Sequence, residues 1–336
     1  LSIRRQRQMC IRDSFCAVSL LGFSACNTST DSTANNDSAT TESVIITNKK
    51  SGFSADNAYQ NIASQLDFGF RIPGTPSHKK CADWLFGQLK NQCDTSYFQV
   101  GQSKNPTTGA AIPIYNIIGS INPKATKRMI FAAHWDSRPM ADQDDNNPKE
   151  PILAANDGAS GVGVILELAR LLHTQKPEWG VDFILFDAED LGIAEIENSF
   201  CLGSQYWGQN PHTPNYKANF GVLLDMVGGK DAKFMWEANS NQYANWILVH
   251  TWQIAKELGH DNHFQLQNIG AITDDHKYVY EATKIPMIDI IQYNESTGFA
   301  PYWHTHDDNL EAVDKNTLQA VGNTLLHLIF NPPATL

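Results

Sequence analysis

Short apolar runs that alternate with helical patterns, and that end in histidine or acidic residues, limit the fold of this chain more than any other feature. The expected strands are 115–121, 128–133, 181–186, 221–224 and 285–291. The expected helices are 54–66, 77–89, 161–173, 241–258 and 316–330, with Ser54 and Ser77 as caps and a short helix that begins at Asp274-Asp275-His276. This order predicts an α/β three-layer sandwich whose central mixed, mostly parallel sheet is flanked by helices.

The polar residues at the ends of these runs are expected to meet at one edge of the sheet. His134 follows one apolar run, Glu189 and Asp190 follow the next, and Asp225 follows a third. In open α/β sheets the ligand site lies at the carboxyl ends of the strands. Because imidazole and carboxylate groups are the ligands of catalytic zinc, the pattern predicts a zinc enzyme.

The adjacent acids Glu189 and Asp190 are expected to have different tasks. Neighbouring residues on an extended chain point in opposite directions, so one acid can bind metal while the other faces substrate. A buried carboxylate such as Asp225 requires a cation or a hydrogen-bond donor as its partner. His134 and Asp136 are spaced so that the carboxylate can orient the imidazole.

Some of these residues have an equally simple structural interpretation. Asp157 lies in the turn Asn156-Asp157-Gly158 before a helix, where an acid is as consistent with capping as with metal binding. For Asp274 we expect an N-cap. His304 alone would be a structural histidine, but with two carboxylates it completes a three-ligand zinc set.

Charge and cysteine content exclude two classes of site. The net charge is −11, with 36 acidic against 25 basic residues, and phosphate binding needs clustered Lys and Arg, so nucleic acid is not an expected partner. Cys81, Cys93 and Cys201 are the cysteines outside the first 26 residues, and the sequence assigns no disulfide among them. No C-x-x-C pair exists, so the sequence does not support a thiolate zinc site.

The first part of the chain has the composition of a targeting segment. We interpret residues 1–26 as a lipoprotein leader, because basic residues precede the short apolar run 15–25 and Cys26 follows small residues. We do not expect the start of this leader to be the native one. Residues 27–49 are expected to form a disordered polar tether, and 50–336 a single catalytic domain. The expected location is periplasmic or cell-surface in a Gram-negative bacterium, with membrane contact only through the lipid.

The motifs together resemble those of a known enzyme superfamily. His134-x-Asp136, Asn156-Asp157-Gly158, Glu189-Asp190 and His304-Thr305 are similar to the zinc aminopeptidases. Over residues 55–330 the chain most closely resembles the glutaminyl-peptide cyclotransferases. The motifs that carry this closer resemblance are Arg71-x-Pro73-Gly74-x-Pro76, His134-x-Asp136-Ser137-Arg138, Asp274-Asp275-His276 and Trp303-His304-Thr305-x-Asp307-Asp308-Asn309.

The resemblance implies a role for each matching residue. It implies one zinc ion per chain, held by Asp157, Asp190 and His304, although the family has Glu where Asp190 stands. It implies that Glu189 shuttles a proton. It also implies a hydrogen-bond network through Asp225 and Asp275. Trp303 would form a wall of the pocket, and Asp289 would bind substrate where the family has a histidine. His134 and Asp136 would either bind a second metal ion or support the ligands of the first.

The reaction that the resemblance implies is cyclisation of an N-terminal glutamine to pyroglutamate with release of ammonia, by a monomer that acts on peptides or proteins. One alternative is a di-zinc aminopeptidase, in which His134 and Asp225 bind a second ion and Asp157 bridges both. The Trp303 that precedes the last ligand favours the cyclase. Another alternative is a binding lipoprotein with a structural metal, which would have no use for the free acid Glu189.

Overall fold

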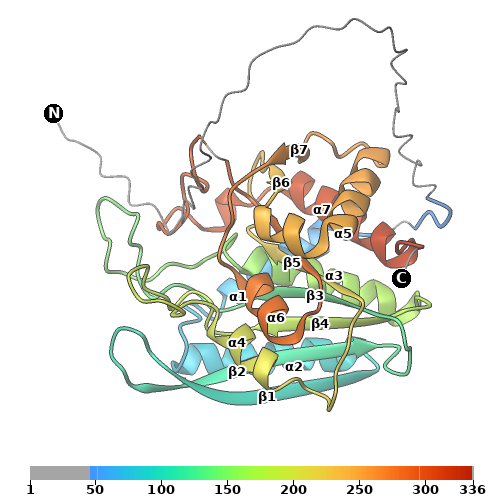
Figure 1. Ribbon diagram of the computed structural model, residues 1–336. Helices are drawn as coiled ribbons and strands as arrows, with labels where there is room; N and C mark the ends of the chain where they lie inside the picture. Colours follow the sequence, from blue (N-terminus) through green and yellow to red (C-terminus); the bar gives the residue numbers. More distant parts are fainter. Residues whose placement is uncertain (1–45, 51, 295, 335–336) are drawn as a thin grey trace, which may run out of the picture.

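A central mixed sheet organises the computed structural model, which describes residues 46–50, 52–294 and 296–334 (Figure 1). Among these residues, six strands form the sheet in the order β1-β2-β4-β3-β5-β8. The strands β4, β3, β5 and β8 are mutually parallel, whereas β1 and β2 run antiparallel at one edge. The strands are β1 (Thr95–Lys104), β2 (Ala111–Ile121), β3 (Arg128–His134), β4 (Gly180–Phe186), β5 (Phe220–Asp225) and β8 (Met287–Ile291).

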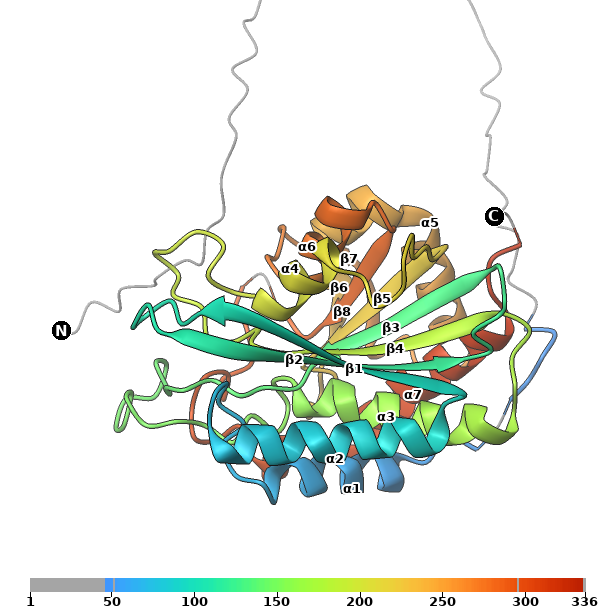
Figure 2. The same ribbon diagram turned by 90° about the horizontal axis from the view of Figure 1, so that it is seen from below.

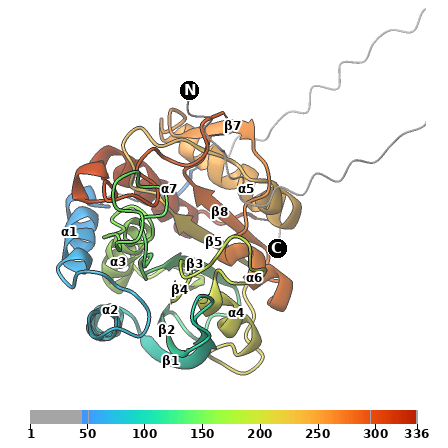
Figure 3. The ribbon, with the colours of Figure 1, turned by 90° about the vertical axis from the view of Figure 1, so that its left-hand side faces the viewer.

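Helices cover both faces of this sheet, so the predicted three-layer α/β sandwich is confirmed. Figures 2 and 3 show α1, α2 and α3 on one side of the sheet and α4 and α6 on the other. The larger apolar core also receives side chains from α5 and α7, and the smaller core lies under α4 and α6. The helices are α1 (Ala55–Leu66), α2 (Pro76–Gln92), α3 (Ala159–Thr174), α4 (Leu202–Gln209), α5 (Ala238–Glu257), α6 (Asp275–Thr283) and α7 (Lys315–Phe330).

Several elements differ from the sequence prediction. The strand β1, the helix α4 and a small parallel pair formed by β6 (Phe234–Trp236) and β7 (Phe264–Asn268) were not expected. Ser54 caps α1 as predicted, because its side chain accepts a hydrogen bond from the backbone N–H of Asn57. Ser77 does not cap α2. Thr75 does so, and Pro76 occupies the first helical position, where its missing N–H leaves no donor unpaired.

A buried ion-pair network ties the central strand β4 to its neighbours. The Asp182 carboxylate is fully buried and accepts two hydrogen bonds from Arg128, from Nε at 2.8 Å and from Nη2 at 2.6 Å. Ser120 and Tyr216 donate to the same carboxylate. Full pairing offsets the cost of burying these charges, so an acid is tolerated in the middle of the sheet.

The structure also shows the state of the cysteines and where the folded domain begins. Cys81, Cys93 and Cys201, the cysteines of the described residues, are free. The leader and most of the tether lie outside the described residues. Asn48, which we assigned to the tether, contacts the domain, because its N–H donates to Asn331 Oδ1 at 3.1 Å. Among the described residues, no helix is both long and apolar enough to span a membrane.

Candidate active site

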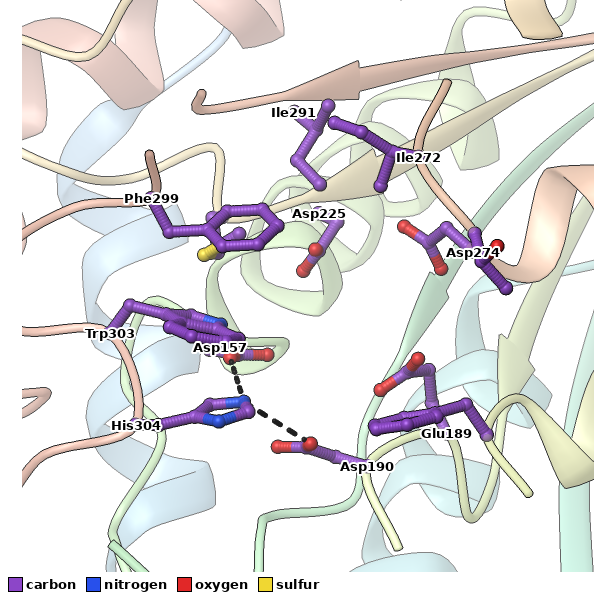
Figure 4. Close-up of a pocket in the computed structure, with 13 residues that line it drawn as sticks. Asp157, Glu189, Asp190, Asp225, Ile272, Asp274, Ile291, Phe299, Trp303 and His304 are labelled. Carbon is purple, nitrogen blue, oxygen red and sulfur yellow. Dashed lines mark ion pairs between the residues drawn. The ribbon is translucent and has the colours of Figure 1, made fainter. Parts of the chain in front are cut away.

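A pocket lies where the parallel strands β4, β5 and β8 end, as expected for an α/β sheet (Figure 4). The turn before α3 contributes an acid to it, and the loop before the short 3-10 helix Leu310–Ala312 contributes aromatic and imidazole rings. Most of the predicted site residues therefore meet in one place. The lining residues are Asp157, Glu189, Asp190, Phe200, Asp225, Met226, Ile272, Thr273, Asp274, Ile291, Phe299, Trp303 and His304.

Asp157, Asp190 and His304 form a set that fits a metal ion. One donor atom of each lies within 4.8 Å of the others. His304 Nε2 is 3.4 Å from Asp190 Oδ1 and 3.6 Å from Asp157 Oδ2. These separations are long for hydrogen bonds, but ligands at about 2.0–2.1 Å from a tetrahedral zinc ion lie roughly 3.3–3.5 Å apart. Asp190 Oδ2 is also buried without a hydrogen-bond partner, so the donor set suits zinc.

His134 and Asp225 form a second set around the same Asp157. His134 Nε2 lies 3.0 Å from Asp157 Oδ1 and 3.3 Å from Asp225 Oδ1. Asp157 therefore offers one carboxylate oxygen to His134 and the other to His304. Burial lowers the pKa of His134, but the neighbouring acids Asp136, Asp157 and Asp225 outweigh this effect and raise the pKa well above its usual value.

Two further carboxylates hold the backbone of the acidic ligands in place. Asp136 lies beside His134 as predicted, with its Oδ1 3.5 Å from His134 Nδ1. It also accepts the backbone N–H groups of Glu189, at 3.0 Å, and Asp190, at 3.1 Å. Asp308 in the same way accepts the N–H of Asp157 at 3.1 Å. Each acidic ligand is thus anchored through its main chain.

Glu189 has the environment of a general base or acid. Burial raises the pKa of its carboxyl group well above the usual value, and the nearby acids Asp190, Asp274 and Asp275 raise it further, against the opposing effect of His134. The buried Cys201 thiol donates to Glu189 Oε1 at 3.2 Å, and the Cys201 N–H donates to the Glu189 carbonyl at 2.9 Å. This environment suits a group that first accepts and then donates a proton.

Aromatic side chains close one wall of the pocket. The Trp303 ring stacks on His304 with centroids 3.7 Å apart, and Phe299 lies 4.5 Å from Trp303. Trp303 lines the pocket, as predicted, and it also restricts the His304 ring. Ile291 and Ile272 complete the apolar side in Figure 4.

The structure places two predicted residues behind the pocket rather than in it. Asp274, the N-cap of α6, lines the pocket, whereas Asp275 begins the helix and is buried outside the pocket lining. Asp289 is fully buried, with its Oδ2 3.9 Å from His276 Nδ1. These positions do not support the predicted direct contact of Asp289 with substrate. Asp274, which the sequence analysis treated as an N-cap, is the acid of this pair that lines the pocket.

The sequence interpretation missed Asp142, Cys201 and Phe299. Asp142 Oδ1 lies 3.1 Å from His304 Nδ1. Its only local signal is the position four residues after Arg138, with which it pairs. Cys201 and Phe299 lie in irregular loops, where neither residue type nor spacing points to a pocket.

The chain forms an α/β sandwich with two carboxylates and a histidine in an open pocket at its strand ends. This combination defines the class of zinc-dependent exopeptidase-like proteins. The sequence profile of peptidase family M28 matches residues 116–329. The chain belongs to peptidase family M28, and its relatives imply a zinc cofactor.

Three relatives illustrate the range of activities within this similarity. The glutaminyl cyclase of Porphyromonas gingivalis is 47% identical, with a TM-score of 0.80 over 82% of this chain and 98% of that chain. A Zn-dependent exopeptidase from Parabacteroides distasonis is 45% identical, with a TM-score of 0.81 over 84% of this chain and 99% of that chain. Aminopeptidase YwaD of Bacillus subtilis is 29% identical over 226 residues, which are 64% of this chain but 44% of that protein.

Proposed function

We propose that this chain is a zinc-dependent glutaminyl-peptide cyclotransferase, which converts an N-terminal glutamine into pyroglutamate and releases ammonia. The observation that carries the proposal is the pocket, in which Glu189, Asp225 and Asp274 face the zinc-ligand set beside an apolar aromatic wall. A substrate α-amine needs acidic partners, and a glutamine side chain needs a small pocket that excludes water. The similarity to the Porphyromonas gingivalis cyclase over nearly the whole of that chain supports the same activity.

Asp157, Asp190 and His304 are the residues that would hold the zinc ion. When bound, zinc supplies Lewis-acid polarisation of the side-chain amide carbonyl of the substrate. Asp225 and Asp274 bind the α-amino group and orient its nitrogen toward that carbonyl carbon. Attack within one molecule has an entropic advantage over attack by water, and Trp303 and Phe299 reduce access of water.

Glu189 is the group that moves the proton. A bond forms between the α-amino nitrogen and the side-chain carbonyl carbon, and the bond from that carbon to the amide nitrogen breaks. Glu189 accepts a proton from the attacking nitrogen and donates it to the leaving nitrogen, so ammonia departs and the carboxylate is regenerated. Its raised pKa suits both halves of this transfer.

The proposal is tested by a product assay combined with metal analysis. We expect the purified protein to release ammonia from peptides that begin with Gln, and not from matched peptides that begin with Asn, whose shorter side chain cannot form the five-membered ring. We expect one tightly bound zinc ion per chain, measured by elemental analysis. Failure to cyclise Gln peptides with zinc bound would contradict the cyclase proposal.

A di-zinc aminopeptidase is the second candidate, and the two-sided placement of Asp157 favours it. Its two carboxylate oxygens face His134 and His304 separately, as in a bridging ligand. Glu189 would then activate a water molecule. A requirement for two zinc equivalents, together with release of the N-terminal residue from Leu- or Ala-peptides, would support this function and exclude the cyclase.

We further propose that the protein is exported and anchored through a lipid on Cys26, which lies outside the described residues. The apolar run 15–25 is too short to span a bilayer, and Ser24-Ala25 offers the small residues that precede a lipidated cysteine. More than one acyl chain gives stable anchoring, and the polar tract after Cys26 gives the domain reach. Cys26→Ser should release the protein from membranes or stall its processing. Unchanged fractionation with an unmodified Cys26 by mass spectrometry would contradict the anchor alone.

A further inference from the structure

One guanidinium group links two of the three residues proposed to bind zinc. Arg138 follows β3, and its side chain is 5% exposed. Its Nη1 donates to Asp190 Oδ1 at 3.0 Å, and also to the backbone carbonyls of Asp190, at 3.1 Å, and Gly192, at 3.3 Å. Both the side chain and the main chain of Asp190 are therefore held by one cation.

The other edge of the same guanidinium holds Asp142. Arg138 Nε donates to Asp142 Oδ1 at 2.6 Å, and Nη2 donates to Oδ2 at 3.1 Å. Paired hydrogen bonds between a guanidinium and a carboxylate are stronger and more directional than a single ion pair. The Phe200 ring, which lines the pocket, lies 5.8 Å from the guanidinium carbon.

Asp142 in turn connects this pair to His304. Its Oδ1 lies 3.1 Å from His304 Nδ1, while His304 Nε2 lies 3.4 Å from Asp190 Oδ1. A histidine that binds metal through Nε2 carries its proton on Nδ1, where a carboxylate can accept it. Arg138, Asp142, His304 and Asp190 therefore form a closed ring of contacts. Asp142 Oδ1 is shared between Arg138 and His304.

This closed ring of contacts among Arg138, Asp142, His304 and Asp190 has a role other than stabilising the fold. Asp190 and His304 come from loops far apart in sequence, and in the absence of a cation the acids Asp142 and Asp190 would repel each other. Arg138 opposes that repulsion and keeps Asp190 and His304 at the separation that a tetrahedral ion requires. Ligands held in place before binding lose less freedom when the ion arrives.

We propose that Arg138 and Asp142 form a positioning clamp that sets the zinc affinity of the site. The inference rests on the proposed zinc ligands, but it does not depend on whether the bound enzyme cyclises glutamine or removes N-terminal residues. The clamp acts through Asp190 and His304, and neither Arg138 nor Asp142 is needed to contact substrate.

The test measures zinc affinity directly, by competition of the purified protein with a chromophoric chelator. We expect Arg138→Met to weaken zinc binding by about 10–100-fold, the range typical of groups that orient metal ligands. Arg138→Lys keeps the charge but cannot bridge Asp142 and Asp190 with a planar fork, so it should restore only part of the affinity. Asp142→Asn should also weaken binding, because an amide oxygen is a poorer acceptor for the His304 N–H.

Arg128→Met is the matched control. Arg128 is also a buried arginine with a two-point pair to an acid, Asp182, but that pair lies within the sheet, in β3 and β4. We expect this variant to lose stability in denaturant while any folded protein binds zinc with wild-type affinity. Wild-type affinity in folded Arg138→Met and Asp142→Asn would overturn the clamp.

The Asp142 variant keeps the test decisive if Arg138→Met does not fold. The Asp142 side chain is 34% exposed, and asparagine has nearly the same shape, so the fold should persist. If the wild-type protein binds zinc but fails the glutamine assay, the proposed function fails and the clamp can still be measured. Normal zinc binding by Asp190 or His304 variants would overturn the clamp, because the clamp requires both residues to be zinc ligands.

Discussion

Glu189→Gln is expected to lower kcat by about 10²–10⁴-fold, the usual contribution of a general acid-base group, while zinc content and fold are unchanged. The amide has almost the same shape as the acid but cannot accept and return a proton. It keeps an oxygen that can accept the hydrogen bond from Cys201. Steady-state kinetics on a Gln peptide, with elemental analysis of the same preparation, measures the effect.

Glu197→Gln is the matched control for this variant. Glu197 lies in the same loop after β4 and is exposed, so the identical chemical change should leave kcat near the wild-type value. Near-full activity of Glu189→Gln with zinc bound would show that another group moves the proton. Asp274 and Asp225, which line the same pocket, would then be the next residues to replace.

His304→Ala is expected to remove tightly bound zinc and to lower turnover by at least about 10³-fold. Lewis-acid stabilisation by a metal is worth several kcal/mol, and about 1.4 kcal/mol corresponds to each factor of ten in rate. Alanine also removes the ring that stacks on Trp303 and that Asp142 contacts. Elemental analysis and the Gln-peptide assay measure both losses.

His306→Ala provides the corresponding control two residues later. His306 Nδ1 pairs with Asp144 Oδ2 at 2.9 Å, and the His306 side chain is 36% exposed, away from the proposed ligand set. This variant should keep its zinc and most of its activity. Retention of a full zinc equivalent by His304→Ala would mean that the ion is held by the His134, Asp157 and Asp225 set instead.

The sequence interpretation succeeded where apolar runs and polar residues lie close together along the chain. The parallel strands β3, β4, β5 and β8 are largely apolar segments, with an internal acid only in β4 and β8. Such segments are recognisable because both faces of each strand are covered. In contrast, β1 is an edge strand that contains Gln99, Gln102 and Ser103 and is only partly buried, so it has no apolar run to detect. The helix α4 contains two glycines and likewise gives a weak helical signal.

The choice between neighbouring residues could not be made from the sequence. Asp274 and Asp275 are adjacent acids, and which one faces the pocket depends on the residue at which α6 begins. Helix ends are uncertain by one or two residues in any sequence-based prediction. The side chains of successive residues in a helix point about 100° apart, so a shift of one residue decides which acid faces the pocket. Asp289 was correctly placed in a strand, but its side chain lies behind the pocket wall.

The sequence alone determined the α/β class, the order of the main elements and the strand ends at which His134, Glu189, Asp190 and Asp225 stand, because these depend on local periodicity and chain order. Only the tertiary structure decided which partners meet across the pocket. Asp136 supports the Glu189-Asp190 backbone as well as His134, and Arg138 joins Asp190 to Asp142. Such contacts depend on distances of a few ångströms between loops that the sheet brings together, and no residue pattern along the chain specifies those distances.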